Sequence, residues 1–231
     1  MNRPYTPTGI RLFFRRRMEK DSPRTFENSF QSFLSVEFNL STGQIPSFFP
    51  ILQKGFRVKA RVGVSVQAFL SDHLGLSPEY VQDRVKTIFL DGKSVDDLDQ
   101  TLIRDGSTLA LSAALPGLAG AVLRRGSPFA GLRSRVVERE KDRSGKAEEG
   151  IVFLKLFNLL LPELGPLILR KGIRIPREDF QELWESLPEE VRERFEETIR
   201  IEGKGLPSEQ IHDFIGSSSI ACLSLVVHSE G

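Results

Sequence analysis

The segment from Arg84 to Ala121 constrains the fold of this 231-residue chain more than any other. It contains two Asp-Gly pairs, Asp91-Gly92 and Asp105-Gly106. Glycine adopts positive φ without steric cost, so each pair predicts a tight turn. The residues before the first pair, Val85–Leu90, and after the second, Thr108–Ser112, are rich in apolar and β-branched side chains. We therefore expect a central strand, a turn, a polar crossover, a second turn and a last strand.

The residues before this segment predict two further strands and a helix. Apolar and polar residues alternate from residue 33 to 40 and again from 56 to 62, the period-two pattern of half-buried strands. Ser65 is a suitable N-cap for a helix whose apolar residues, from Val66 to Leu74, recur at helical spacing. Gly75 is well placed to end that helix in the left-handed conformation. Residues 42–55 are expected to form a loop that folds back onto the core.

Over residues 33–121 this order of elements is that of a β-grasp domain, in which a mixed sheet wraps one helix. The segments Phe89-Leu-Asp-Gly-Lys and Ile103-Arg-Asp-Gly-Ser-Thr-Leu-Ala-Leu resemble the small sulfur carriers of molybdopterin and thiamine biosynthesis. In those carriers a similar Asp-Gly motif leads into the last strand. Ser107 stands here where the carriers usually have an acidic residue.

The chain departs from the carriers immediately after this last strand. The carriers end in Gly-Gly, and the terminal carboxylate is adenylated and becomes a thiocarboxylate. Here the corresponding segment is Pro116-Gly-Leu-Ala-Gly, without Gly-Gly, and the sequence continues to Gly231. The resemblance therefore implies carrier chemistry only if cleavage after Gly120 exposes a terminal glycine. Otherwise Gly117 and Gly120 form a flexible exit, or a place where a partner or ligand approaches the backbone closely.

Composition divides the chain into four parts: an N-terminal arm (1–32), the β-grasp domain (33–121), an Arg-rich linker (122–150) and a mostly helical domain (151–231). In the last part, Ile151–Leu161 is apolar enough for a buried helix or strand and is interrupted by Pro162. Pro166 is expected to start a second short segment. Helices are expected after Pro176 and Pro188, where proline suits the first turn. The predicted fold class is α+β.

The sequence contains no recognisable catalytic or metal-binding pattern. His73, His212 and His228 lie far apart, and Cys222, in an apolar run, is expected to be a small buried hydrophobe. The crossover is acidic, but it lacks the spacing of an EF-hand and is expected to be a solvated loop. We therefore predict no catalytic residue, no metal site and no cofactor. The acidic residues are Asp91, Asp96, Asp97, Asp99 and Asp105.

Three cations in the second strand form the candidate partner-binding surface. Arg57, Lys59 and Arg61 alternate with apolar residues, so their side chains should form a stripe along one face. Such a stripe either keeps the sheet soluble or docks an acidic protein surface. Nucleic acid is not expected, because the face lacks interleaved aromatic residues and the formal net charge is only +1.

These observations favour a non-enzymatic protein-interaction module that docks a protein partner on its β-grasp sheet. The C-terminal helices would provide a second contact or self-association. Two alternatives remain: a sulfur-carrier-like precursor cleaved after Gly120, and an enzyme whose site lies between the domains. No apolar run reaches the roughly 20 residues that span a bilayer, and a single cysteine fits a reducing compartment. We expect a cytoplasmic protein without a cleaved signal or membrane span.

Overall fold

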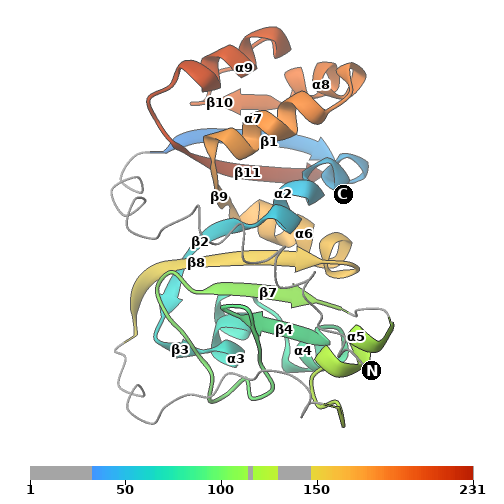
Figure 1. Ribbon diagram of the computed structural model, residues 1–231. Coiled ribbons are helices and arrows are strands. Elements are labelled where there is room, and N and C mark those ends of the chain that lie inside the picture. Colours follow the sequence, from blue (N-terminus) through green and yellow to red (C-terminus); the bar gives the residue numbers. More distant parts are fainter. Residues whose placement is uncertain (1–32, 114–116, 130–146, 231) are drawn as a thin grey trace, which may run out of the picture.

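The computed structural model describes residues 33–113, 117–129 and 147–230, which form a mixed α+β structure (Figure 1). The expected N-terminal arm and most of the expected Arg-rich linker lie outside these residues. Nine strands form one mixed sheet in the order β10-β1-β11-β9-β2-β8-β7-β4-β5, and β3 and β6 form a separate pair. Figure 1 shows this order from β10 at the top to β4 below.

The strands are β1 (Leu34–Ser41), β2 (Phe56–Val62), β3 (Val64–Ser65), β4 (Thr87–Leu90), β5 (Lys93–Ser94), β6 (Leu102–Ile103), β7 (Thr108–Ser112), β8 (Glu148–Phe157), β9 (Ile173–Pro176), β10 (Ile199–Ile201) and β11 (Cys222–Glu230). The α-helices are α2 (Phe49–Lys54), α3 (Val66–Ala68), α4 (Pro78–Asp83), α5 (Gly117–Leu123), α6 (Leu160–Lys171), α7 (Arg177–Ser186), α8 (Glu189–Glu196) and α9 (Ser208–Ser217). A 3₁₀ helix, η3 (Thr42–Phe48), follows β1, and a π-helical turn, η4 (Phe69–His73), follows α3.

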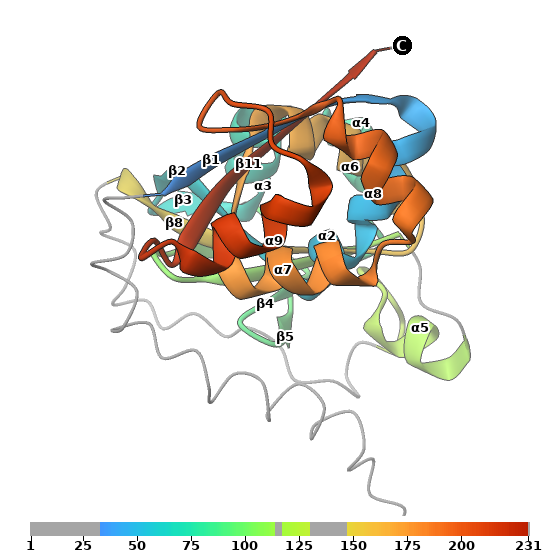
Figure 2. The ribbon, with the colours of Figure 1, turned by 90° about the horizontal axis from the view of Figure 1, so that it is seen from above.

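Alternation of side chains gives the large sheet one continuous apolar face. Neighbouring strands are in register, so buried residues meet across the whole sheet, and they belong to one hydrophobic cluster. Helices α7 and α8 and η3 pack on this face around Phe38, which contacts Phe48, Phe180 and Phe195. In Figure 2, α7, α8 and α9 gather on one side of β1 and β11.

Several local predictions are confirmed. The Ser65 hydroxyl accepts a hydrogen bond from the Ala68 amide at 3.1 Å, so Ser65 is the N-cap of α3. Gly75 has a φ of 77° and ends the helical segment that α3 and η4 form. Both Asp-Gly pairs form turns, and Gly92 and Gly106 each have a φ of 76°. The predicted strand Thr108–Ser112 is β7.

The position of β1 differs from the β-grasp expectation, which placed it in one unit with β2. Strand β1 lies between β10 and β11, and β11 and β9 separate it from β2. Leu34 is in parallel register with Leu223. The two residues lie near opposite ends of the described sequence. The physical reason is that period two fixes which face of a strand is buried but leaves its neighbours unspecified.

Two other expectations need correction. The expected loop at residues 42–55 is helical, because η3 and α2 occupy it and bury Phe48 and Leu52. Proline does not divide the segment after β8: α6 runs without interruption through both Pro162 and Pro166. Pro162 falls in the first turn, where its missing amide has no helical partner to lose, and burial of the leucine face outweighs the bond lost at Pro166.

The C-terminal part supplies both helices and strands. Strand β8 lies between β2, to which it is antiparallel, and β7, to which it is parallel. The open choice at Ile151–Leu161 is therefore resolved as a strand followed by the start of α6. The sheet runs across the predicted domain boundary, but a division into independently folding domains is a different property and stays a prediction. None of the described helices has the length and apolarity needed to cross a membrane.

Candidate functional site

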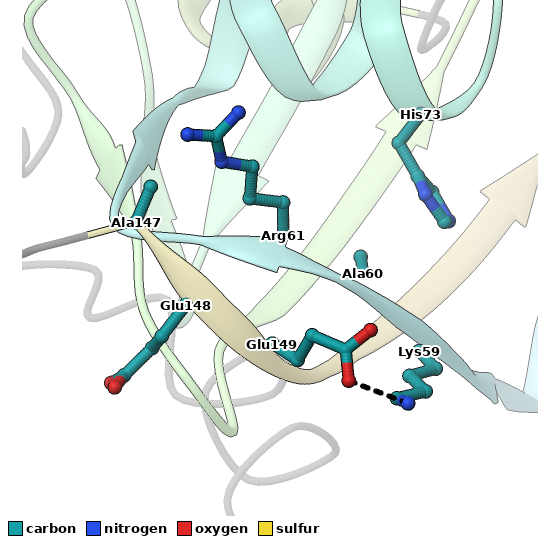
Figure 3. Close-up of a pocket in the computed structure, with 7 residues that line it drawn as sticks. All are labelled: Lys59, Ala60, Arg61, His73, Ala147, Glu148 and Glu149. Atoms are coloured by element: carbon teal, nitrogen blue, oxygen red, sulfur yellow. Dashed lines mark ion pairs between the residues drawn. The ribbon is translucent and has the colours of Figure 1, made fainter.

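A hollow of about 510 Å³ lies beside the end of β2 and the beginning of β8 (Figure 3). Strand β2 contributes Lys59, Ala60 and Arg61, and η4 contributes His73. Residues 147–149, at the start of β8, complete the lining. Lys59 and Arg61, two of the three residues predicted to bind a partner, therefore line the hollow.

The structure separates Arg57 from the other two predicted residues. Lys59 and Arg61 are exposed, whereas Arg57 is only 3% exposed. The Arg57 guanidinium stacks over the Phe153 ring, 4.6 Å from its centre. Arg57 is also in register with Arg174 of β9, whose guanidinium stacks over Phe33. The expectation of three equivalent exposed cations is thus corrected to two.

The different burial of Arg57 follows from the neighbours of β2. At Arg57 the strand lies between β8 on one side and β9 on the other. Beyond Arg57, β8 is the only strand of the described residues that pairs with β2, and the pairing with β9 does not continue. A period-two pattern shows that the three side chains share a face, but it carries no information about where a neighbouring strand departs.

The charges around the hollow are only partly paired. Lys59 forms an ion pair of 2.6 Å with Glu149, and the two side chains are 56% and 77% exposed. Arg61 and Glu148 are exposed, and neither side chain has an ionic partner among the described residues. Figure 3 shows Arg61 and Glu148 directed to different sides of the two strands. Arg61 is therefore a cation available to a partner.

His73 joins the hollow through the π-helical turn. Its ring stacks on Phe69 at 5.1 Å, and its carbonyl accepts a hydrogen bond of 2.7 Å from the Lys171 ammonium. Burial lowers the pKa of His73 below its usual value, and the nearby charge of Lys171 lowers it further. The imidazole is consequently neutral at pH 7. Sequence reasoning missed this position, since nothing local indicates that η4 packs beside β2.

The predicted glycine exit has a different structure from the one expected. Gly117 has a φ of 66° and begins α5, and Gly120 is buried inside this helix. The segment after α5 is anchored by Arg125, which donates hydrogen bonds to the carbonyl oxygens of Val81 and Val85 at 2.7 and 2.8 Å. Gly120 therefore does not lie in an extended tail.

The acidic crossover borders a second hollow, of about 570 Å³, that also includes Gln67 and Arg125. The Asp97 carboxylate accepts hydrogen bonds from the amides of Asp99 and Gln100, as in a polar turn. Among residues 33–113, 117–129 and 147–230, no three His, Cys, Asp or Glu side chains gather closely enough to hold a metal ion. Cys222 is buried, as expected, and burial raises the pKa of its thiol.

Comparison with known proteins adds no relative to this description: no family model, curated protein or solved structure matches the chain. The functional argument therefore rests on the hollow beside β2 and on the strands around it.

Proposed function

We propose that this chain is a non-enzymatic protein-interaction module, and that a protein partner docks at the hollow beside β2 through Lys59 and Arg61. The observation that carries the proposal is the state of Arg61. Its guanidinium is exposed at the hollow and has no acidic partner among the described residues. Because a guanidinium binds a carboxylate through two parallel hydrogen bonds, Arg61 favours an acidic partner.

Lys59 supports the same proposal despite its ion pair with Glu149. Both side chains of this pair are more than half exposed, and such pairs contribute only about 0–1 kcal/mol. A carboxylate of a partner can replace Glu149 at little cost. Glu148, on the other hand, repels an indiscriminately acidic surface. The arrangement favours a partner whose carboxylates meet Lys59 and Arg61 specifically.

We also propose that β2, β8, β7, β4 and β5, together with α3 and η4, form a β-grasp-like unit related to the sulfur-carrier architecture. These five strands are consecutive neighbours in the mixed sheet. In this proposal β8, which comes late in the sequence, takes the position expected of an early strand. Its antiparallel contact with β2 and parallel contact with β7 support the assignment.

Affinity capture from the native source tests the docking proposal. The wild-type chain is compared with a Lys59→Glu/Arg61→Glu variant, and captured proteins are quantified by mass spectrometry. The matched control is Arg194→Glu/Lys204→Glu, which reverses two exposed cations away from the hollow. We expect at least one acidic protein to be lost from the first variant and retained by the control. Equal recovery with all three chains would contradict the proposal.

The alternative of a sulfur-carrier precursor receives less support. Cleavage after Gly120 would have to occur at a buried residue within α5. It would also release a fragment that lacks β8, the strand that joins β2 to β7. Intact-mass measurement of the protein from its native source separates the two ideas. A single species near 26.0 kDa favours the docking module, whereas a fragment ending at Gly120 favours the precursor.

A further inference from the structure

Beyond Arg57, one edge of β2 has no neighbouring strand among the described residues. On one side β2 pairs with β8 along its whole length, from Phe56 to Val62. On the other side the only described pair is Arg57 with Arg174 of β9. From Lys59 to Arg61 this second edge has no strand partner among the described residues, and these three residues form part of the lining of the hollow.

The hydrogen-bonding pattern of β8 shows which backbone groups of β2 face the open edge. The Ile151 amide donates to Asp105 at 2.7 Å, and the Ile151 carbonyl accepts from Gly106 at 2.8 Å, so both point away from β2. Lys59 is opposite Ile151 and Arg61 is opposite Glu149. Residues at alternate positions of an antiparallel pair turn their amide and carbonyl outward. The amides and carbonyls of Lys59 and Arg61 consequently face the open edge, away from β8, and no described residue bonds to them.

Ala60 and His73 are the neighbours of the two cations at this part of β2. Ala60, between the two cations, has a small side chain directed to the opposite face of the sheet. In Figure 3, His73 lies on one side of Ala60 and Glu149 on the other. The Lys171 ammonium holds the His73 carbonyl, which fixes the position of η4 next to β2. An added strand would therefore lie along this edge of β2, next to residues that line the hollow.

We propose that the partner binds as an extended acidic segment that adds a strand to β2 at Lys59–Arg61. This inference rests on the proposed function and names the class of partner and its mode of binding. Backbone hydrogen bonds to Lys59 and Arg61 provide affinity, as in other cases of strand addition. Carboxylates at two alternate positions of the partner lie opposite the two cationic side chains.

The charges of Lys59 and Arg61 also determine which strands cannot pair with this edge of β2. Open edges can pair indiscriminately, and lysine on an edge is one of the devices that prevents such pairing. Lys59 and Arg61 repel basic strands. An apolar strand would offer no negative charge to either cation. The side chain between the two carboxylates of the partner would point toward Ala60 and His73, where the imidazole is neutral. The expected recognition pattern is thus acidic, any compact residue, acidic.

A set of short peptides tests this mode with the full-length chain. The parent probe is acetyl-Glu-Val-Glu-Val-Glu-amide, and a Lys-Val-Lys-Val-Lys peptide controls for charge. Two further peptides carry N-methyl groups either on all glutamate amides or on all valine amides. Only one of these two rows of amides faces β2 in an added strand. Binding is measured by titration, and backbone amide exchange of Lys59 and Arg61 is followed by NMR.

We expect the glutamate peptide to bind and to slow amide exchange at Lys59 and Arg61, while the lysine peptide does not bind. One N-methylated peptide should lose about tenfold or more in affinity, which corresponds to about 1.4 kcal/mol, and the other should stay close to the parent. Equal binding of both methylated peptides and the parent would overturn strand addition. Loss of binding by both would overturn it as well, because an added strand presents only one row to β2.

Proline variants of the protein provide an independent measurement. The Arg61 amide faces the open edge, so Arg61→Pro removes a donor without breaking a bond to β8. Its control, Arg61→Ala, removes the charge and keeps the amide. We expect Arg61→Pro to bind the glutamate peptide about tenfold more weakly than Arg61→Ala. Equal affinities would contradict the inference. A different result would separate the two proposals: partner capture could still depend on Lys59 and Arg61 while both N-methylated peptides bind as tightly as the parent. The docking function would then stand, and strand addition would be wrong.

Discussion

The Asp105 carboxylate accepts a hydrogen bond of 2.7 Å from the backbone amide of Ile151, and so joins the second Asp-Gly turn to β8. The first turn makes a similar contact, because the Asp91 carboxylate accepts from the Thr108 amide at 2.7 Å. In both turns glycine allows the bend and aspartate binds the backbone of a neighbouring segment. The two turns are therefore tertiary contacts as well as local bends, and they position β7 and β8.

Replacement of Asp105 by alanine should destabilise the fold by about 0.5–1.5 kcal/mol, because the half-buried Ile151 amide loses its acceptor on the exposed Asp105 side chain. Chemical denaturation measures the change, and hydrogen exchange at the Ile151 amide should become faster. Asp99→Ala is the control, since the Asp99 carboxylate has no hydrogen bond within the described part of the chain. Equal effects of the two substitutions would show that the Asp105 contact does not hold β8.

Gly150 should tolerate no side chain. A Cβ at this position would lie 2.7 Å from Cγ2 of Val62 and 2.8 Å from the Asp105 carboxylate. Gly150→Ala is therefore expected to cost about 1–3 kcal/mol through overpacking and to displace the Asp105 contact. Gly43→Ala is a suitable control, because nothing lies within 4 Å of its added Cβ. Thermal unfolding of the two variants checks the prediction, and a Gly150→Ala protein as stable as the control would refute it.

The sequence predicted local structure well where the signal itself is local. The Ser65 cap, the left-handed Gly75 and the two turns each depend on residues within a few positions. Strand neighbours depend on distant residues, and the contact of Leu34 with Leu223 has no local signature. The candidate site shows the same limit. Period two placed Lys59 and Arg61 on one face, but only the departure of β9 distinguishes them from buried Arg57.

Glu163 is expected to stabilise the contact between α4 and α6. Its carboxylate accepts a hydrogen bond of 2.6 Å from the Tyr80 hydroxyl and is also bound by the Arg84 guanidinium. The bond from Arg84 lowers the pKa of Glu163, so this contact stabilises the fold above the ordinary carboxyl pKa and weakens as pH falls through the lowered value. Since the site is largely exposed, Glu163→Gln should cost at most about 1 kcal/mol.

A double-mutant cycle of Glu163→Gln with Arg84→Gln measures this coupling by denaturation at neutral and at acidic pH. We expect a favourable coupling energy at neutral pH that disappears in acid. A coupling that is unchanged by acid would contradict an ionic origin.

His73 should make stability depend on pH in a different range. Its pKa is lowered in the folded chain by burial and by Lys171, whereas the unfolded chain has a histidine pKa of about 6.5. The unfolded state therefore binds the proton more tightly, and stability falls as pH drops below about 6.5 until the folded-state pKa is passed. His73→Gln should flatten this part of the profile.

The measurement is the free energy of unfolding between about pH 7.5 and 5.5 for the wild type, His73→Gln and His228→Gln. His228 is the control because it is exposed in β11. We expect the profile of the control to follow the wild type. If His73→Gln keeps the full slope, His73 does not titrate as its buried position beside Lys171 requires.

The position of β8 gives a prediction about which parts of the chain can fold alone. A polypeptide of residues 1–120 lacks β8, so β2 and β7 would each lose a neighbour along an apolar edge. We expect it to show no cooperative thermal unfolding. A permuted polypeptide, with residues 147–158 joined through a short turn to residues 55–129, restores that strand. Leu154 lies opposite Phe56, so the turn connects strand ends that are already adjacent. Cooperative unfolding of the permuted chain alone would support the β-grasp-like unit, and a folded 1–120 polypeptide would show that β8 is dispensable.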